Sequence, residues 1–238
     1  EAFHGAVNAH MKYGATCIFP TLGPLPMTEI RKGVALCESA MAEKNSPVLG
    51  LQLEGPYLNP KMAGSLLTDA LKDPDPDEYK SLLESTNCIK RWDASPELPG
   101  ALDFACYVRS KGLLAAVSHT EAEFEDIKAA YEAGFTHAAH FYNAMPGFHK
   151  RREYKYEGTV ESVFLEDDMT VEVIADGRHL PSTILRLVYK LKGVERTCLT
   201  TDALAYAANE GKPVDDPRII IEDVYKISNL LLFLRGMQ

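Results

Sequence analysis

The segment Leu113–Asn143, LLAAVSHTEAEFEDIKAAYEAGFTHAAHFYN, contains a short apolar run, an amphipathic stretch and a second short run. Within the amphipathic stretch, Phe124, Ile127 and Tyr131 are spaced as on one face of a helix, and Gly134 follows where a helix C-cap is expected. The two flanking runs have the length and character of strands. The segment therefore predicts a strand–helix–strand unit, the repeating element of a parallel sheet.

The same alternation of short β-rich runs and longer helical patterns continues along the chain. Seven runs are predicted as strands: Ala15–Leu22, Val48–Gly55, Cys88–Ala94, Leu113–His119, Thr136–Asn143, Thr170–Asp176 and Arg196–Asp202. Several of them end in polar residues, which favours an α/β fold of the (β/α)8 TIM-type barrel kind, where loops at the strand ends converge on one rim. An open doubly wound sheet is the alternative, but its site is fed by fewer strands.

An eighth strand is not visible in the sequence. Because the chain opens directly in a helical pattern, Ala2–Tyr13, we expect the first barrel strand to precede it. The C-terminal stretch Asn229–Gln238 stops abruptly after the strand-like Arg218–Ile221, so the sequence is expected to be a fragment or to be joined across missing loops. We assign residues 1–208 to the catalytic barrel, strands 2 to 8, and 209–238 to its C-terminal part or to a following segment.

Composition and charge restrict the class of protein. The 238 residues are 46% hydrophobic and 25% charged, as in an ordinary globular domain. No long apolar run and no signal peptide are present, which predicts a cytoplasmic protein. A net charge of -9 disfavours nucleic-acid or membrane binding and favours a small-molecule substrate. The five cysteines are scattered and never form a C-x-x-C pair, which argues against a disulfide framework or a cysteine zinc site.

Three of the polar strand ends carry Glu54, His119 and His140. Two imidazoles and a carboxylate from separate strand ends are a common ligand set for a catalytic zinc-like ion with an open position for water. Taken singly, each histidine would more often be a hydrogen-bonded strand-end residue. The three together favour a metal site. His137 precedes His140 by three residues, so on a strand the two should point to opposite faces.

The remaining candidate site residues each have a functional and a structural interpretation. Asp202, in LTTDA, is a candidate general base and acid beside a metal-bound water, or equally the N-cap of a following helix. His179, in ADGRHL, could orient substrate, although a hydrogen-bonded loop histidine is the commoner case. The run Asn143–Arg152, NAMPGFHKRR, combines a strand end with Arg151 and Arg152, which would make an anion site; most charge runs are solvated faces.

Five segments, in matching order and spacing, carry a resemblance to one family. LEGPYLNPKMAG (Leu53–Gly64), SHT (Ser118–Thr120), THAAHFYNAM (Thr136–Met145), IADGRH (Ile174–His179) and TTDA (Thr200–Ala203) resemble the N-acetylglucosamine-6-phosphate deacetylases of the amidohydrolase superfamily. The resemblance implies an enzyme that hydrolyses the acetamide of N-acetylglucosamine 6-phosphate to glucosamine 6-phosphate and acetate. It also implies a homodimer.

The resemblance assigns roles to individual residues. Glu54, His119 and His140 would bind one divalent metal, with zinc as the first choice and iron, cobalt or manganese as alternatives. Asp202 would be the proton shuttle for a metal-activated water. The sugar phosphate would be held by Asn143, Ala144 and Arg151 or Arg152, and His179 would contact the substrate.

The chain departs from the family pattern at Leu66. In many relatives a histidine follows the glycine of the LEGP segment by two residues and helps to polarise the carbonyl; here Gly64 is followed by Ser65 and Leu66. This departure has three alternative explanations. A nearby residue or a second metal polarises the carbonyl, the rate of hydrolysis is lowered, or a stretch of loop is absent from the sequence. The alternatives are another amidohydrolase, acting on a cyclic amide or a non-phosphorylated sugar, and a catalytically impaired sugar-phosphate-binding paralogue.

Overall fold

A computed structural model describes residues 2–12 and 14–204 of the chain, and the predictions for residues 209–238 lie outside this part. The main strands are β1 (Thr21–Leu22), β2 (Leu51–Glu54), β3 (Ile89–Ala94), β4 (Leu114–Val117), β5 (Phe135–Ala138), β8 (Thr170–Ile174) and β9 (Thr197–Thr200). The helices are α1 (Ala2–Lys12), α2 (Met27–Met41), α3 (Pro76–Ser85), α4 (Ala101–Ser110), α5 (Phe124–Ala133), α6 (Thr159–Leu165) and α7 (Ser182–Lys192), with a 3-10 turn at Pro60–Met62.

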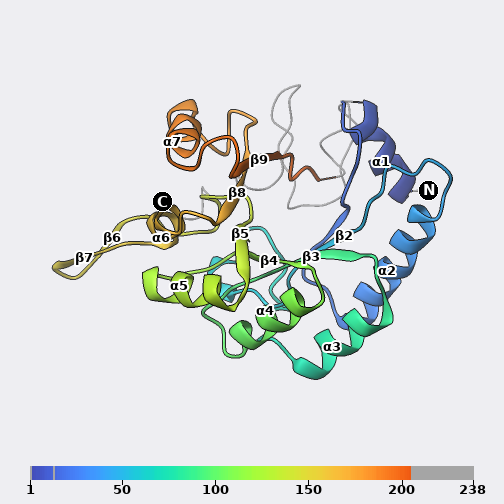
Figure 1. Cartoon of the computed structure of the whole chain (residues 1–238), viewed down its shortest axis with the longest axis horizontal. Helices are drawn as coiled ribbons and strands as arrows, with labels where there is room; N and C mark the ends of the chain where they lie inside the picture. The colour runs from blue at the N-terminus through green and yellow to red at the C-terminus, as the bar shows by residue number, and fades with distance from the viewer. Residues whose placement is uncertain (1, 13, 205–238) are drawn as a thin grey trace.

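The seven strands form one parallel sheet in the order β1-β2-β3-β4-β5-β8-β9, which is their order along the chain (Figure 1). Each predicted run contributes one strand, so the existence and order of the seven strands are confirmed, but the strand predicted at Thr136–Asn143 ends at Ala138. Ala15–Leu22 is reduced to Thr21–Leu22 and an isolated bridge between Ile18 and Val48. The fold is therefore α/β with sequential parallel strands, as the strand–helix–strand segment predicts.

The sheet is curled. Arg91 on β3 and Glu172 on β8 lie three strands apart in the sheet order, which is roughly 14 Å on a flat sheet. Their side chains nevertheless meet, with Arg91 Nη1 2.7 Å from Glu172 Oε2. These two side chains therefore project from the concave side of the sheet. Helices α2 to α5 lie along its outer side (Figure 1).

The outer side of the sheet is packed by aromatic rings. Trp92 of β3 stacks on Tyr57 at a centroid distance of 5.4 Å and meets the edge of Phe104 of α4 at 5.3 Å, and all three side chains are fully buried. The Trp92 indole N–H donates to the Gly55 carbonyl at 2.9 Å. Large buried rings dominate core energetics. This cluster fixes the end of β2, which carries Glu54.

The helix predictions are also confirmed. Helix α5 ends at Gly134, whose φ of 123° suits glycine and whose N–H donates to the Ala130 carbonyl at 3.0 Å. Helix α1 covers the predicted opening helix up to Lys12.

The antiparallel hairpin β6 (His149–Arg151) and β7 (Tyr154–Tyr156) is an addition that the sequence does not predict, because its charged and polar residues read as a solvated loop. It projects from the body of the fold (Figure 1).

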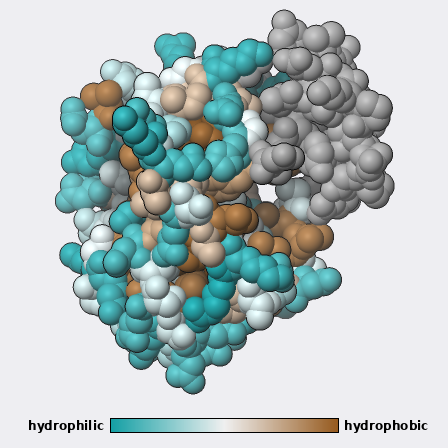
Figure 2. Space-filling view, turned by 90° about the vertical axis from the view of Figure 1, so that its right-hand side faces the viewer, coloured by the Kyte–Doolittle hydropathy of each residue, from teal (hydrophilic) through white to brown (hydrophobic). Residues whose placement is uncertain are grey.

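The surface over α1 and α2 is largely hydrophilic, with separate apolar patches (Figure 2). Among the residues that the structure describes, no helix has both the length and the apolar character needed to cross a membrane.

Candidate metal centre

The predicted site residues follow the carboxyl ends of parallel strands. Glu54 is the last residue of β2, His119 and His140 lie two residues beyond β4 and β5, and Asp202 lies two residues beyond β9. Because parallel strands end on the same side of a sheet, these residues come from different strands to one rim.

The three predicted ligands converge. Glu54 Oε1 lies 3.1 Å from His119 Nε2 and 3.0 Å from His140 Nε2. The two imidazole rings are nearly perpendicular, at 83°, with centroids 4.9 Å apart. One ligand atom from each residue lies within 4.8 Å of the other two. The structure therefore brings together the carboxylate and the two histidines that the sequence proposes as ligands.

The second nitrogen of His119 supports a cation at this point. His119 Nδ1 lies 2.7 Å from the Met62 carbonyl, which can only accept, so Nδ1 carries the proton. In the neutral ring the lone pair is then on Nε2, which faces an oxygen of Glu54. Two lone pairs at that distance repel one another unless a cation binds both. This arrangement, with the outer ring nitrogen donating to a carbonyl, is typical of metal-ligating histidines.

His140 is more deeply enclosed. Its Nε2 also lies 3.3 Å from Ser118 Oγ, and its Nδ1 is buried without a hydrogen-bond partner in the described part of the chain. Burial lowers the pKa of His140, but the hydrogen bond and charge of Glu54 outweigh it and raise the pKa to about 9. Burial also raises the pKa of Glu54, and its contacts with the two imidazoles hold it well below its usual range. Without a metal, a proton on His140 compensates the carboxylate.

The backbone of the rim is strained where the site residues stand. His119, His140, Ala144 and Asp202 have positive φ values of 46°, 28°, 52° and 45°. A left-handed backbone costs a non-glycine residue on the order of 1–3 kcal/mol and is concentrated at functional sites. These four predicted site residues share the feature with a fifth, Arg152 of the hairpin, whose φ is 55°.

The carboxyl of Asp202 lies among the charges of the centre, although the residue as a whole is exposed. Burial of the carboxyl raises the pKa of Asp202, the favourable charge of His140 opposes this, and Glu54 adds to it. The helix that Asp202 would cap in the alternative reading lies outside the described residues.

The predicted substrate residues fall into two groups. His179 Nδ1 is paired with Asp176 Oδ2 at 2.7 Å, in the loop after β8. Asn143 donates its side-chain amide to the His140 carbonyl at 2.9 Å, and the Ala144 carbonyl accepts the Thr120 N–H at 3.1 Å. Asn143 and Ala144 therefore adjoin the segments that carry His140 and His119, whereas His179 contacts Asp176 in a separate loop.

Arg151 and Arg152 lie elsewhere, on the projecting hairpin (Figure 1). The Arg151 guanidinium is 2.6 Å from Glu123 Oε1 and 3.7 Å from the centroid of the Tyr156 ring. The structure does not bring either arginine against the three metal ligands.

The expectation that His137 and His140 point to opposite faces is wrong. β5 ends at Ala138, and the left-handed turn at His140 breaks the strand alternation on which the expectation depends. Both side chains lie on the concave side of the sheet. His137 Nε2 is 3.5 Å from Glu172 Oε2, and His140 Nε2 is 3.0 Å from Oε1 of Glu54, which shares a face of β2 with Gln52, the partner of the concave-side Asp93.

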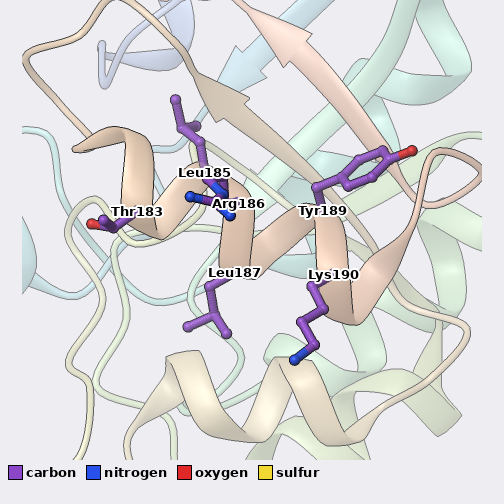
Figure 3. Close-up of a pocket in the computed structure, with 6 residues that line it drawn as sticks. All are labelled: Thr183, Leu185, Arg186, Leu187, Tyr189 and Lys190. Atoms are coloured by element: carbon purple, nitrogen blue, oxygen red, sulfur yellow. The ribbon is translucent and has the colours of Figure 1, made fainter.

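The sequence gives no direct signal for three supporting groups. These are the Met62 carbonyl, the Ser118 hydroxyl and the Glu172 carboxylate. Met62 lies in the motif LEGPYLNPKMAG and Ser118 in SHT, but neither motif assigns these residues a role, and Glu172 lies in no quoted motif. An open hollow elsewhere, along α7, contains none of the predicted site residues (Figure 3); it is lined by Thr183, Leu185, Arg186, Leu187, Tyr189 and Lys190.

Comparisons with known proteins agree with the resemblance inferred from the motifs. The chain is 30% identical over 211 residues to an N-acetylglucosamine-6-phosphate deacetylase of Vibrio furnissii, covering 86% of the chain and 52% of that protein. It is 29% identical over 161 residues to an N-acetylgalactosamine-6-phosphate deacetylase of Escherichia coli O157:H7, covering 67% of the chain and 41% of that protein. The chain thus spans about half the length, or less, of these curated relatives. A scan against models of known protein families found no match.

A solved structure gives the same result. The chain superposes with a TM-score of 0.76 and 30% identity on a mutant N-acetyl-D-glucosamine-6-phosphate deacetylase of Mycobacterium smegmatis in complex with N-acetyl-D-glucosamine-6-phosphate. The match covers 87% of the chain and 51% of that structure.

Proposed function

We propose that the chain belongs to the N-acetylglucosamine-6-phosphate deacetylases and carries their metal-dependent active site. The observation that carries this proposal is the convergence of Glu54, His119 and His140, with the His119 lone pair facing the carboxylate at 3.1 Å. We further propose that the curled parallel sheet is part of a (β/α)8 barrel, and that the protein is a cytoplasmic homodimer. The similarity of the chain to enzymes of this name supports the family and the active site, and the TM-score of 0.76 supports the barrel. The homodimer follows only from what the family resemblance implies, and the cytoplasmic location only from the sequence.

The chemistry follows from the donor set. A divalent ion held by Glu54, His119 and His140, zinc by preference, would act as a Lewis acid that activates water for attack on the acetamide carbonyl. Iron, cobalt and manganese suit the same ligands. The outer hydrogen bond from His119 Nδ1 to Met62 orients one of these ligands before any ion binds.

Asp202 acts as general base and then as general acid. Its carboxylate accepts a proton from the attacking water as the new C–O bond forms, and gives it to the amide nitrogen as the C–N bond breaks. The products are acetate and the free amine of glucosamine 6-phosphate. A carboxyl whose pKa is raised by burial suits both steps, because it holds a proton more readily than an ordinary aspartate does.

Metal binding is expected to tighten as the pH rises toward about 9. The metal must displace the proton that Glu54 stabilises on His140, whose pKa is raised to about 9, so protons compete with the ion below that pH. The zinc dissociation constant, measured by chelator competition between about pH 6 and about pH 8.5, should fall with each step upward. An affinity that does not change with pH over this range would contradict a role for His140 as ligand.

Substrate phosphate is proposed to bind Asn143, the Ala144 backbone and one of the two hairpin arginines, with His179 contacting the sugar. Arg151→Ala or Arg152→Ala should raise the KM for N-acetylglucosamine 6-phosphate about 10–100-fold with little change in kcat, because a charge-assisted hydrogen bond to phosphate is worth about 1.5–3 kcal/mol. Steady-state acetate release measures both constants.

The matched control for this pair is Lys155→Ala. It removes a positive charge from the same hairpin, where Lys155 lies over the Phe148 ring at 5.4 Å. The KM of this variant should stay at the wild-type value. If neither arginine variant raises the KM, the phosphate assignment is wrong and a non-phosphorylated substrate becomes the better hypothesis.

A second candidate function is a catalytically impaired sugar-phosphate binder, and Leu66 favours it. This leucine, at the position where relatives carry a histidine, is partly buried in the loop after Gly64, and its side chain lies close to Gly23. An assay of acetate release across the glucosamine, galactosamine and mannosamine 6-phosphate epimers, at saturating metal, separates the two. Binding of the sugar phosphates without any acetate release would favour the impaired binder.

A further inference from the structure

A buried ion-pair network lies on the concave side of the sheet. The Arg91 guanidinium donates to both oxygens of Glu172, at 2.7 and 2.8 Å, and to both oxygens of Asp93, at 2.6 and 3.0 Å. Gln52 donates its amide to Asp93 at 2.9 Å. These side chains come from β2, β3 and β8, and they form one continuous chain of hydrogen bonds across the interior of the curled sheet.

Stability alone does not explain this network. Removing two charges from water costs several kcal/mol per ion, and a well-packed apolar pair of similar volume is often as stable or more stable. Burial raises the pKa of Glu172, but the hydrogen bonds from His137 and Arg91 hold it well below its usual range, so the carboxylate is charged. A buried, charged and fully oriented carboxylate is well suited to fix a neighbouring group.

That neighbouring group is the backbone of His140. The His140 N–H lies beyond the end of β5 and donates to Glu172 Oε1 at 3.2 Å. At this residue φ is 28°, outside the conformations that a histidine prefers. The next residue is held by the same element, because the Phe141 N–H donates to the Glu172 carbonyl at 2.7 Å. Residue 172 therefore contacts the strained turn with both its side chain and its backbone.

We propose that Glu172 is a positioning residue, oriented by its two hydrogen bonds from the Arg91 guanidinium. It holds His140 in the conformation in which its Nε2 faces Glu54. The inference rests on the metal centre proposed above. Glu172 acts through His140 and touches neither the metal nor the substrate. Its role is to set the affinity and the coordination geometry of the metal.

A second metal site at Glu172 is the competing explanation, since His137, Glu172 and Cys198 each offer a ligand atom within 4.8 Å of the others. The Arg91 guanidinium occupies both Glu172 oxygens, and a fixed positive charge at this distance repels a cation. The cluster is therefore better explained as support for His140 than as a ligand set.

The test is Glu172→Gln in the full chain. The glutamine amide keeps one oxygen, but its NH2 group faces an N–H of Arg91. The guanidinium can therefore no longer make two hydrogen bonds to the side chain and hold it in place. Loss of such an outer hydrogen bond typically weakens metal binding about 10–100-fold, which is the expected rise in the zinc Kd. The visible absorption spectrum of the cobalt-substituted protein should also change, and kcat should fall while the KM for N-acetylglucosamine 6-phosphate stays the same.

Two further variants make the result specific. Lys192→Met removes another buried charge, whose Nζ donates to the Glu166 carbonyl at 2.6 Å, and should lower the Tm without altering the cobalt spectrum or the zinc Kd. Arg91→Lys keeps the charge but replaces the planar guanidinium with one ammonium group, and should raise the zinc Kd less than Glu172→Gln does. It provides the readout if Glu172→Gln fails to fold.

The outcomes distinguish the two proposals. A wild-type Kd and cobalt spectrum in a folded Glu172→Gln or Arg91→Lys variant overturn the positioning role and leave the metal centre intact. A wild-type chain that binds neither zinc nor cobalt overturns the metal centre itself, and the positioning role with it.

Discussion

Asp202→Asn is expected to lower kcat for acetate release by about 10²–10⁴-fold, the range that general acid–base catalysis contributes. The amide has nearly the same shape as the carboxyl but cannot accept the proton of the attacking water or deliver one to the leaving nitrogen. Metal content should stay at the wild-type level, because Asp202 is not among the three converging ligands. Single-turnover acetate release and metal analysis of the purified variant measure the two quantities.

The control for this variant is Asp168→Asn. Asp168 is an exposed carboxylate that pairs with Arg196 at 3.2 Å, just before β8 and so at the opposite end of the sheet from the rim. Surface ion pairs of this kind contribute about 0–1 kcal/mol, so activity and fold should both be retained. Full activity in Asp202→Asn, with Asp168→Asn also active, would remove Asp202 from the mechanism and favour the helix-capping reading.

His140→Ala is expected to have the second large effect, a loss of metal affinity greater than the 10–100-fold that outer hydrogen bonds typically contribute. The variant removes one of the two nitrogens that face Glu54, and it leaves the buried carboxylate with His119 alone. Acetate release should fall in parallel with metal content. Metal analysis after dialysis against a weak chelator, followed by an acetate-release assay, measures both.

His4→Ala serves as the matched control. His4 pairs with Glu43 at 2.6 Å on the surface of the opening helix, so the same substitution there should leave metal content unchanged. If His140→Ala retained the metal at wild-type affinity, the ligand set would have to be redrawn.

Much of the fold could be predicted from the sequence, because its signals are local. The strand–helix–strand pattern around Leu113–Asn143 and the polar strand ends are set by residue spacing, and the sheet order follows from them. The hairpin β6–β7 could not be predicted, because its alternation is masked by charged residues.

In the candidate site too, the sequence predicts only the features that are set by local residue spacing. Glu54, His119 and His140 stand at predicted strand ends, so their convergence follows from the topology. The contacts that orient them are tertiary and leave no spacing in the sequence: Met62 reaches His119 from a separate turn, and Glu172 reaches His140 from β8. The assumption of strand alternation failed at His137 because a left-handed turn at His140 interrupts the strand.

The central claim is that Glu54, His119 and His140 hold a divalent ion on which deacetylation depends. Its most direct test is acetate release from N-acetylglucosamine 6-phosphate by the chelator-treated chain as zinc is added back, in parallel with Glu54→Gln. The account predicts no release without metal, a return of activity as the first equivalent binds, and no return in Glu54→Gln. Release that survives the chelator, or that returns equally in Glu54→Gln, would contradict it.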